Sequence, residues 1–150
     1  HIAMHAFGKI TLFFCAGAIL IATHKSEVSE MNGLGRRMPF TMGAFFIASI
    51  SIAGLPPLGG LWSKWYLVLG SLDAGYGVLV GVLMLSTLLN IAYLLPIPIR
   101  AFFAGDRNTA GAITEAPVPC PIAIGATTAM CLVLSFYPDP ILQLASLLVR

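Results

Sequence analysis

The sequence predicts an all-α fold, a polytopic transmembrane helix bundle with one discontinuous (broken) helix. Of the 150 residues, 58% are apolar and only 9% are charged, and the mean hydropathy is +0.92. Soluble proteins contain about 45–50% apolar and about 25% charged residues, so this composition is typical of an integral membrane protein. It excludes a disordered chain, a collagen and a secreted disulfide scaffold. The net charge of +2 is too small and too dispersed for a nucleic-acid-binding protein.

Four apolar stretches approach the length that a bilayer crossing needs. A hydrocarbon core about 30 Å thick requires roughly 20 apolar residues of helix. We expect spans at about residues 1–22, 40–72, 76–103 and 119–137. No stretch alternates between apolar and polar residues with a period of two, so the spans are expected to be helices. Residues 141–150 would form either an interfacial helix or the start of a fifth span.

The first span carries a polar stripe of His1, His5 and Lys9, spaced i, i+4 and i+8. This spacing places the three side chains on one helical face, which drifts by about 40° per step. Histidine titrates near neutral pH, so side chains one turn apart can pass a proton directly or through one water. Lys9 lies roughly 20 Å of helix from the far end of the span. We favour a proton path over interfacial anchoring, which remains the alternative for His1.

The second stretch is too long for one straight crossing, and its middle contains Gly54, Pro56, Pro57, Gly59 and Gly60. Two successive prolines remove two backbone donors and clash with the preceding turn, and glycine favours an unwound segment. We therefore expect the helix to break at residues 54–60, near mid-membrane. Such breaks are tolerated where they are buried in protein or line a wet cavity, and they recur at ion and proton sites in transporters. The alternative is a kinked packing helix without chemistry.

Lys64 follows the break by four residues and lies roughly 12 Å of helix before the end of the span. An intramembrane lysine costs about 2.5–3.5 kcal/mol on insertion scales and is by default a functional residue. We expect it in the first turn of the second half-helix, where burial and the positive end of the helix dipole both disfavour the charged form. The sequence therefore predicts a buried lysine that can gain and lose a proton.

The carboxylates all lie in connections or at the ends of spans: Glu27, Glu30, Asp73, Asp106, Glu115 and Asp139. The two deep lysines, Lys9 and Lys64, consequently have no acidic partner in this sequence. Buried charges are normally paired. Their counter-charges are expected from other segments, from another subunit, or from water and anions.

The third and fourth spans carry no charged side chain in their middle. The third has a modest polar face, for which hydrogen bonding between helices is expected, and it consists of Ser86, Thr87, Asn90 and Tyr93. Pro96 and Pro98 are expected to end this helix. The fourth span is expected to serve packing. The cysteines lack the close spacing of a metal or redox pair and are expected to be small core residues, namely Cys15, Cys120 and Cys131.

Basic residues concentrate in two of the three connections. Residues 24–39 contain Lys25, Arg36 and Arg37, whereas residues 104–117 follow Arg100 and contain Arg107. The turn between the second and third spans has only Asp73. By the positive-inside rule, loops 24–39 and 104–117 are expected on the cytoplasmic side of a bacterial or archaeal cytoplasmic membrane.

Several motifs, in this order, resemble the proton-conducting antiporter family. They are HIAMHAFGK at 1–9 with TLFF at 11–14, GLGRRMP at 33–39, AGLPP at 53–57 leading to SKW at 63–65, NIAY at 90–93 and RAFF at 100–103. The family comprises subunits of Mrp-type multisubunit Na⁺/H⁺ antiporters and the antiporter-like membrane subunits of respiratory complex I and of related membrane hydrogenases. The lysine followed by tryptophan is more similar to the D subunits of Mrp antiporters than to relatives with glutamate there. Beyond residue 105 the resemblance is weak.

The resemblance implies roles for individual residues. Lys9 would be the proton-relay lysine near the membrane centre, with His1 and His5 on its approach, and Lys64 the terminal lysine on the broken helix. Gly8 stands where many members have a bulky residue, which implies looser packing beside Lys9.

The resemblance also implies a division of the chain. Residues 1–104 would form the C-terminal part of the antiporter-like transmembrane domain, with three spans. Residues 105–150 would add a connection, a fourth span and a short apolar tail. Because the family's earlier glutamate–lysine pair is absent, the chain is expected to be a fragment.

The expected function is proton translocation in a cation/proton antiporter or a redox-driven proton pump. Its expected partners are other membrane subunits, the lipid bilayer, protons, and Na⁺ or K⁺. The alternative is a structural membrane subunit of an NADH:quinone oxidoreductase or membrane hydrogenase complex, with no conduction role. The sequence has no phosphate loop, catalytic triad, haem pair or zinc spacing, so we expect no active site, cofactor or metal in this chain. An enzymatic role would exist only as a subunit of a translocating oxidoreductase.

Overall fold

The computed structural model describes residues 1–24, 27–56, 58–104, 115–137, 139 and 143. Over these residues the chain is helical and contains no strand, which confirms the predicted fold class. The longer helices are α1 (Ile2–Thr23), α3 (Pro39–Ala53), α4 (Gly60–Asp73), α5 (Gly77–Leu94), α6 (Pro96–Phe103) and α7 (Pro119–Phe136). Two short helices, η1 (Val28–Met31) and α2 (Leu34–Arg37), connect α1 to α3. Among the described residues, the stretches long and apolar enough to cross a membrane are Ile2–Thr23, Gly77–Phe103 and Pro119–Phe136.

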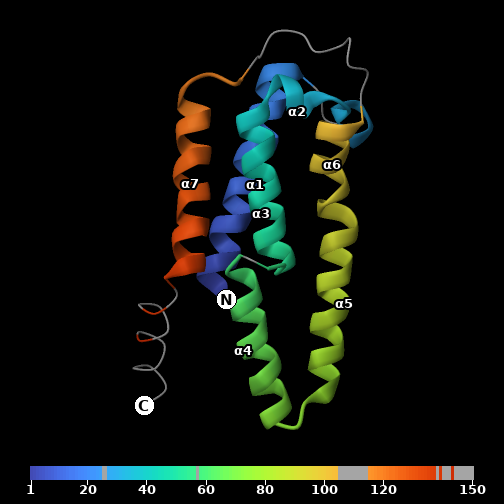
Figure 1. The fold of residues 1–150 in the computed structure, drawn as a ribbon, viewed down its shortest axis with the longest axis vertical. Coiled ribbons are helices and arrows are strands. Elements are labelled where there is room, and N and C mark those ends of the chain that lie inside the picture. The colour runs from blue at the N-terminus through green and yellow to red at the C-terminus, as the bar shows by residue number, and fades with distance from the viewer. Residues whose placement is uncertain (25–26, 57, 105–114, 138, 140–142, 144–150) are drawn as a thin grey trace.

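Helices α1, α3 and α7 lie side by side and form a three-helix core (Figure 1). Their buried side chains form one cluster that includes Ile19 of α1, Met42 and Phe45 of α3, and Ile124 of α7. The prediction for the cysteines is confirmed for Cys15 and Cys131, which are buried, and Cys120 is half-buried.

Gly8 brings α1 and α3 close together. It is buried, and a Cβ added there would lie 2.8 Å from Cγ1 of Ile52 on α3. The expectation that Gly8 loosens the packing beside Lys9 is therefore wrong. Without a side chain at this position, the Ile52 side chain can approach the α1 backbone directly, and the contact becomes tighter.

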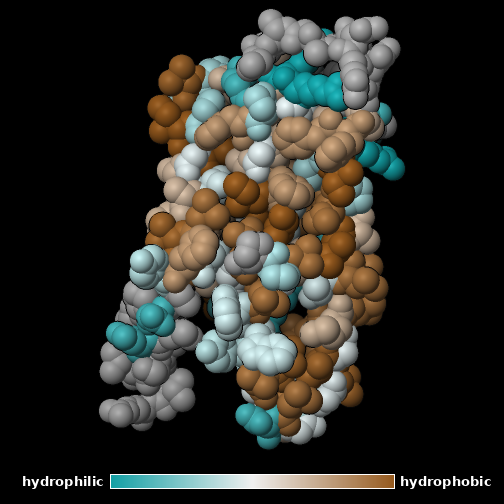
Figure 2. Space-filling view, in the orientation of Figure 1, coloured by the Kyte–Doolittle hydropathy of each residue, from teal (hydrophilic) through white to brown (hydrophobic). Residues whose placement is uncertain are grey.

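Helices α4 and α5 form a hairpin that extends beyond one end of the three-helix core (Figure 1). Gly60 is the one buried residue of α4, and Leu94 is the one buried residue of α5. Figure 2 shows apolar colour over much of this hairpin, with hydrophilic colour gathered toward the ends of the molecule. The hairpin thus presents most of its apolar surface outward, as expected of a membrane segment.

The break in the second span is present as predicted. Helix α3 ends at Ala53, α4 begins at Gly60, and Pro57 between them lies outside the described residues. Gly54 ends α3 with φ +77°, a left-handed conformation that glycine adopts without steric cost, and its N–H donates to the Ile50 carbonyl oxygen (3.0 Å). Each half, of 15 and 14 residues, is shorter than the roughly 20 residues that one crossing requires.

The third span covers Gly77–Phe103, close to the predicted residues 76–103. Helix α5 ends at Leu94, just before Pro96, as the prolines predicted, but Pro96 then begins a second helix, α6. Proline is well suited to the first position of a helix, because the N–H that it lacks has no partner there. The Leu95 N–H donates to the Ile91 carbonyl oxygen (3.2 Å), and the Leu95 carbonyl oxygen accepts from Ile99 (3.3 Å), so the helical path continues across the junction.

The first basic connection lies beside the carboxyl end of the third span. Gly35 packs against Ala101 and Phe102, so α2, which carries Arg36, lies next to α6, which carries Arg100. The turn after Asp73 lies at the opposite end (Figure 1). Several predicted features lie outside the described residues: Lys25, residues 105–114 with Asp106 and Arg107, and most of the tail 141–150.

Candidate functional site

The polar stripe of α1 reaches the start of α4. The imidazole rings of His1 and His5 stack with their centroids 5.5 Å apart. Nδ1 of His1 forms a hydrogen bond of 2.9 Å with Oγ of Ser63 on α4. The structure therefore joins the histidine end of the stripe to α4 through Ser63, the residue directly before Lys64.

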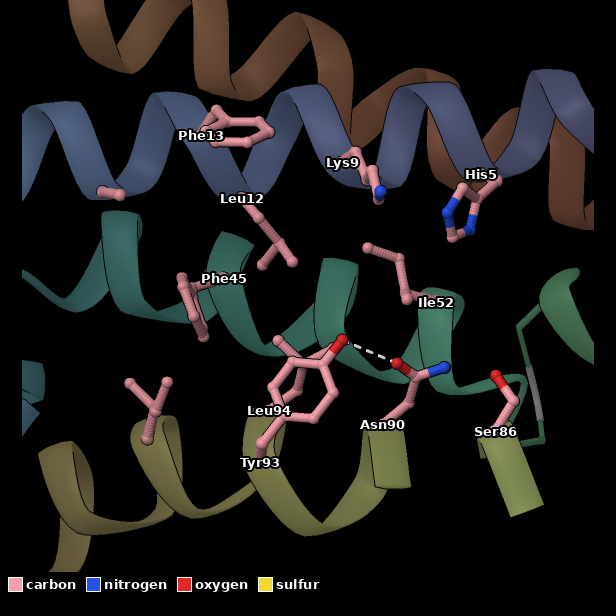
Figure 3. A pocket seen from close by; sticks show the side chains of 12 residues that line it. His5, Lys9, Leu12, Phe13, Phe45, Ile52, Ser86, Asn90, Tyr93 and Leu94 are labelled. Carbon is pink, nitrogen blue, oxygen red and sulfur yellow. Dashed lines mark hydrogen bonds between the residues drawn. The ribbon is translucent and has the colours of Figure 1, made fainter. Parts of the chain in front are cut away.

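An open groove of about 510 Å³ lies between α1, α3 and α5. His5 and Lys9 of α1 point into it, toward the face of α5 that carries Asn90 and Tyr93 (Figure 3). The Tyr93 hydroxyl donates to Oδ1 of Asn90 at 2.6 Å. The groove is lined by His5, Lys9, Leu12, Phe13, Ala16, Phe45, Ile52, Ser86, Asn90, Tyr93, Leu94 and Ile97. A mixed polar and apolar groove of this size can hold water beside the two basic side chains.

Lys64 folds back from α4 across the break. Its Nζ donates to the Ala53 carbonyl oxygen at 2.8 Å and to Oγ1 of Thr87 on α5 at 2.9 Å. A Cβ on Gly54 would lie 2.8 Å from Cδ of Lys64, so the glycine leaves room for the lysine side chain. The hydrogen bond to Thr87 confirms that the polar face of α5 bonds to a neighbouring helix.

The electrostatic surroundings of Lys64 differ from the prediction. Lys64 is the fifth residue of α4, one past its first turn, and its ammonium group lies at the last residue of α3. The carboxyl end of a helix carries partial negative charge and unpaired carbonyl oxygens. The expectation that a positive helix end disfavours the ammonium is thus wrong, because the long side chain reaches to the negative end of a different helix.

Neither lysine is buried. Lys9 is exposed and Lys64 is half-buried, and the described part of the chain contains no buried lysine or histidine. The prediction of buried lysines is therefore wrong for the chain by itself. The physical reason is the groove, because no described side chain fills the space in front of Lys9. Among the described residues, no carboxylate pairs with either lysine.

One of the carboxylates, Glu115, bonds to the amino end of α3 and does not pair with Lys9 or Lys64. Its Oε1 accepts from the Phe40 N–H (2.9 Å) and its Oε2 accepts from the Thr41 hydroxyl (2.7 Å). These residues form the first turn of α3, whose amino end carries unpaired N–H groups and partial positive charge. The carboxylate thus caps the half-helix whose other end accepts from Lys64.

Two serines at the break were missed by the sequence reasoning. The Gly59 N–H donates to Oγ of Ser135 on α7 at 2.8 Å, and Ser63 links His1 to α4. Ser63 could have been noticed as the polar neighbour of Lys64. For Ser135 the sequence carries no signal, since it lies 76 residues from Gly59 and within a span that was assigned to packing.

Residues 1–90 match the family described as "NADH:quinone oxidoreductase/Mrp antiporter, TM". The matched residues include the stripe of α1, the break and Lys64. The chain therefore belongs to this family of antiporter-like membrane subunits, and the resemblance proposed from its motifs is confirmed.

Individual relatives come from both branches of the family. The chain is 45% identical to the N subunit of the NADH-quinone oxidoreductase of Desulforudis audaxviator over 119 residues, which are 79% of this chain and 24% of the relative. It is 32% identical to the D subunit of the Na(+)/H(+) antiporter of Alkalihalophilus pseudofirmus over 144 residues, which are 95% of this chain and 29% of the relative. With NADH-ubiquinone oxidoreductase chain 5 of Sus scrofa the identity is 36% over 110 residues, 71% of this chain and 18% of the relative. The chain thus spans less than a third of the length of each.

Proposed function

We propose that this chain conducts protons as a segment of a membrane subunit in a cation/proton antiporter or a redox-driven proton pump. The observation that carries the proposal is the placement of the basic side chains. His5 and Lys9 line one groove, and His1, stacked on His5, bonds to Ser63, the residue before Lys64 at the helix break. Protons pass between the two lysines through the imidazoles and through water in the groove. No bond other than bonds to hydrogen is made or broken along this path.

The hydrogen bonds of Lys64 suit both of its protonation states. A neutral amine has two N–H groups and one lone pair, whereas an ammonium has three N–H groups. Ala53 and Thr87 accept two N–H groups in either state, and Lys64 has no further partner in the described part of the chain. The third position on Nζ is therefore free to release or receive the proton.

The break supplies one of these two acceptors. In an uninterrupted helix, the Ala53 carbonyl oxygen would accept from the amide of residue 57, but that residue is a proline and has no N–H. The oxygen is consequently available to Lys64. An unpaired carbonyl at membrane depth is costly unless it finds a donor, so the double proline and the lysine complement each other.

The proposal extends to the surroundings of the segment. Residues 1–104 hold the relay, residues 105–150 support it, and other membrane subunits or chain segments supply the counter-charges that Lys9 and Lys64 lack. Loops 24–39 and 104–117 face the cytoplasm of a bacterial or archaeal cell. Na⁺ or K⁺ is the exchanged ion if the parent complex resembles the Na(+)/H(+) antiporter relatives, and quinone reduction drives transport if it resembles the quinone oxidoreductases.

Two substitutions at Lys64 in the full-length subunit test the relay. Lys64→Ala removes the titrating group, and we expect proton transport into inverted membrane vesicles to fall by about 100-fold or more. Lys64→Arg keeps a positive charge that does not release its proton near neutral pH, so transport should fall as far. Ser71→Ala on the same helix removes only a local hydroxyl bond to Leu67 and serves as the control. Near-normal transport by an assembled Lys64→Ala complex would overturn the relay.

A structural role is the second candidate, because Lys64 joins the end of α3 to α4 and α5 through its two hydrogen bonds. A subunit that only braces its neighbours would lose assembly in the Lys64→Ala variant and retain it in Lys64→Arg, whose side chain keeps N–H donors for both acceptors. Native gel electrophoresis of the two variants separates this role from the relay. The relay predicts that both variants assemble and that neither conducts.

A further inference from the structure

A buried hydroxyl of α7 contacts the helix break. The Gly59 N–H donates to Oγ of Ser135 at 2.8 Å, and the same hydroxyl donates to the Cys131 carbonyl oxygen one turn earlier in α7 at 2.7 Å. A serine hydroxyl has one donor and two lone pairs. Its single proton is therefore used within α7, which orients a lone pair toward the break.

Gly59 and Ser135 also approach each other closely. A Cβ on Gly59 would lie only 2.7 Å from Cα of Ser135 and 3.0 Å from Cε of Met4 on α1. The backbone of Gly59 has φ −65°, which every residue type adopts readily. The glycine is therefore required by the close approach of α7 and α1, and its backbone conformation does not require it.

This contact sets where α4 begins. Gly59 directly precedes the first residue of α4, and Lys64 lies five residues further along the chain. Gly60 is the only residue of α4 that is buried, so side-chain packing does little to fix this half-helix. The Ser135 bond, made between buried partners, is therefore a large part of what holds the amino end of α4 in place.

We propose that Ser135 is a positioning residue for Lys64. By holding the Gly59 amide against α7, it keeps Nζ of Lys64 within reach of both Ala53 and Thr87. This inference rests on the proposed relay, and it gives α7, which lies beyond the matched residues 1–90, a part in proton transfer.

The chain offers a matched control for removing this hydroxyl. Thr128 lies on the same helix, is also buried, and its hydroxyl donates to the Ile124 carbonyl oxygen at 2.7 Å. Ser135→Ala and Thr128→Val each remove one such local bond without changing the side-chain size greatly. Only Ser135→Ala also removes the acceptor of the Gly59 N–H. A third variant, Ser135→Cys, keeps the size and offers a weak sulfur acceptor.

The test uses the full-length subunit in its complex, with Lys64→Ala measured in parallel. For Ser135→Ala we expect normal amounts of complex and a transport rate lowered about three- to tenfold. We also expect the pH of half-maximal transport to move by about half a unit or more, because the surroundings of the titrating lysine change. Ser135→Cys should change the transport rate and the pH of half-maximal transport in the same direction, but by less. Thr128→Val should show neither change.

Each other outcome has one meaning. Equal rates and pH profiles for Ser135→Ala and Thr128→Val, with Lys64→Ala inactive, would overturn the positioning role and leave the relay standing. Full activity of assembled Lys64→Ala would overturn the relay itself. If Ser135→Ala fails to assemble, the pH profile of Ser135→Cys decides, and a profile identical to wild type would overturn the positioning role.

Discussion

The two halves of the discontinuous helix are held in place by different interactions. Helix α3 buries nine of its 15 residues between α1 and α7, whereas α4 buries one of its 14. Around its start, α4 depends on hydrogen bonds that involve Gly59, Ser63 and Lys64. One half is thus part of a packed core, and the other is attached to that core at one end.

Because α3 is held by packing and α4 by a few hydrogen bonds, a proton transfer at Lys64 affects the two helices differently. Close-packed side chains resist displacement in every direction, whereas a single hydrogen bond contributes only about 0.5–1.5 kcal/mol. Two of the bonds that fix α4 belong to Lys64, the residue proposed to change its protonation state. Loss of the proton keeps both bonds but weakens them, because a hydrogen bond from an ammonium is roughly twice as strong as one from a neutral amine. Helix α4 is then held less firmly, whereas the side-chain packing of α3 does not change.

The largest expected effect comes from adding a methyl group where the two halves touch. A Cβ on Gly60 would overlap the Ser51 carbonyl oxygen, so Gly60→Ala forces a backbone shift. We expect it to destabilise the subunit by about 3 kcal/mol or more, measured as loss of folded protein on heating in detergent. Gly70→Ala, also on α4, meets nothing within 4 Å and should be neutral or stabilising by up to about 1 kcal/mol. Equal stability of the two variants would contradict the tight junction.

A smaller effect is expected from truncating one methionine in each region. Met42 of α3 is 0% exposed, and Met42→Ala should lower the free energy of unfolding by about 2 kcal/mol. This value is at the low end of the usual range because lipid gives less transfer energy than water does. Met84 of α5 is 53% exposed, and Met84→Ala should cost less than about 0.5 kcal/mol. Thermal unfolding of the purified subunit measures both, and a larger loss for Met84 would show that the hairpin is packed as firmly as the core.

The smallest expected effect concerns the cap of α3. Glu115→Gln removes the charge at the amino end of the helix, and we expect a loss of about 1 kcal/mol, with transport retained. Glu27 makes no side-chain cap bond, so Glu27→Gln should change stability by less than about 0.5 kcal/mol. Salt provides a further check, because the difference between the two variants should shrink as ionic strength screens the charge. No difference at low salt would contradict the capping role.

Much of the fold could be predicted because apolar length and proline position are local properties. The break at Pro56 and Pro57 was predicted correctly, since two missing donors disrupt a helix wherever it packs. The end of α5 before Pro96 was also predicted correctly. The start of α6 at Pro96 was not, because whether a second helix follows a proline depends on the direction in which the chain can continue. The predicted division at residue 104 remains a prediction.

The candidate site could be predicted only where its members share a helix. The spacing of His1, His5 and Lys9 places them on one face regardless of context, and it identified the stripe correctly. The bonds of Lys64 to Ala53 and Thr87 depend on how three helices meet, so the sequence predicted the lysine but not its surroundings. The role of the stripe and of Lys64 as a relay remains a prediction that transport measurements must test.

The sequence by itself determined that the chain is a set of apolar helices, that one of them breaks, and that Lys9 and Lys64 lie within apolar stretches. These follow from composition and from backbone chemistry, which act within a few residues. Only the tertiary structure decided that Lys64 faces the negative end of α3, that Glu115 caps the other end, and that Ser135 meets Gly59. Such contacts join residues that are separated in the chain. They form only when helix packing brings the end of one helix close to a donor or acceptor on another, and no local sequence pattern specifies that meeting.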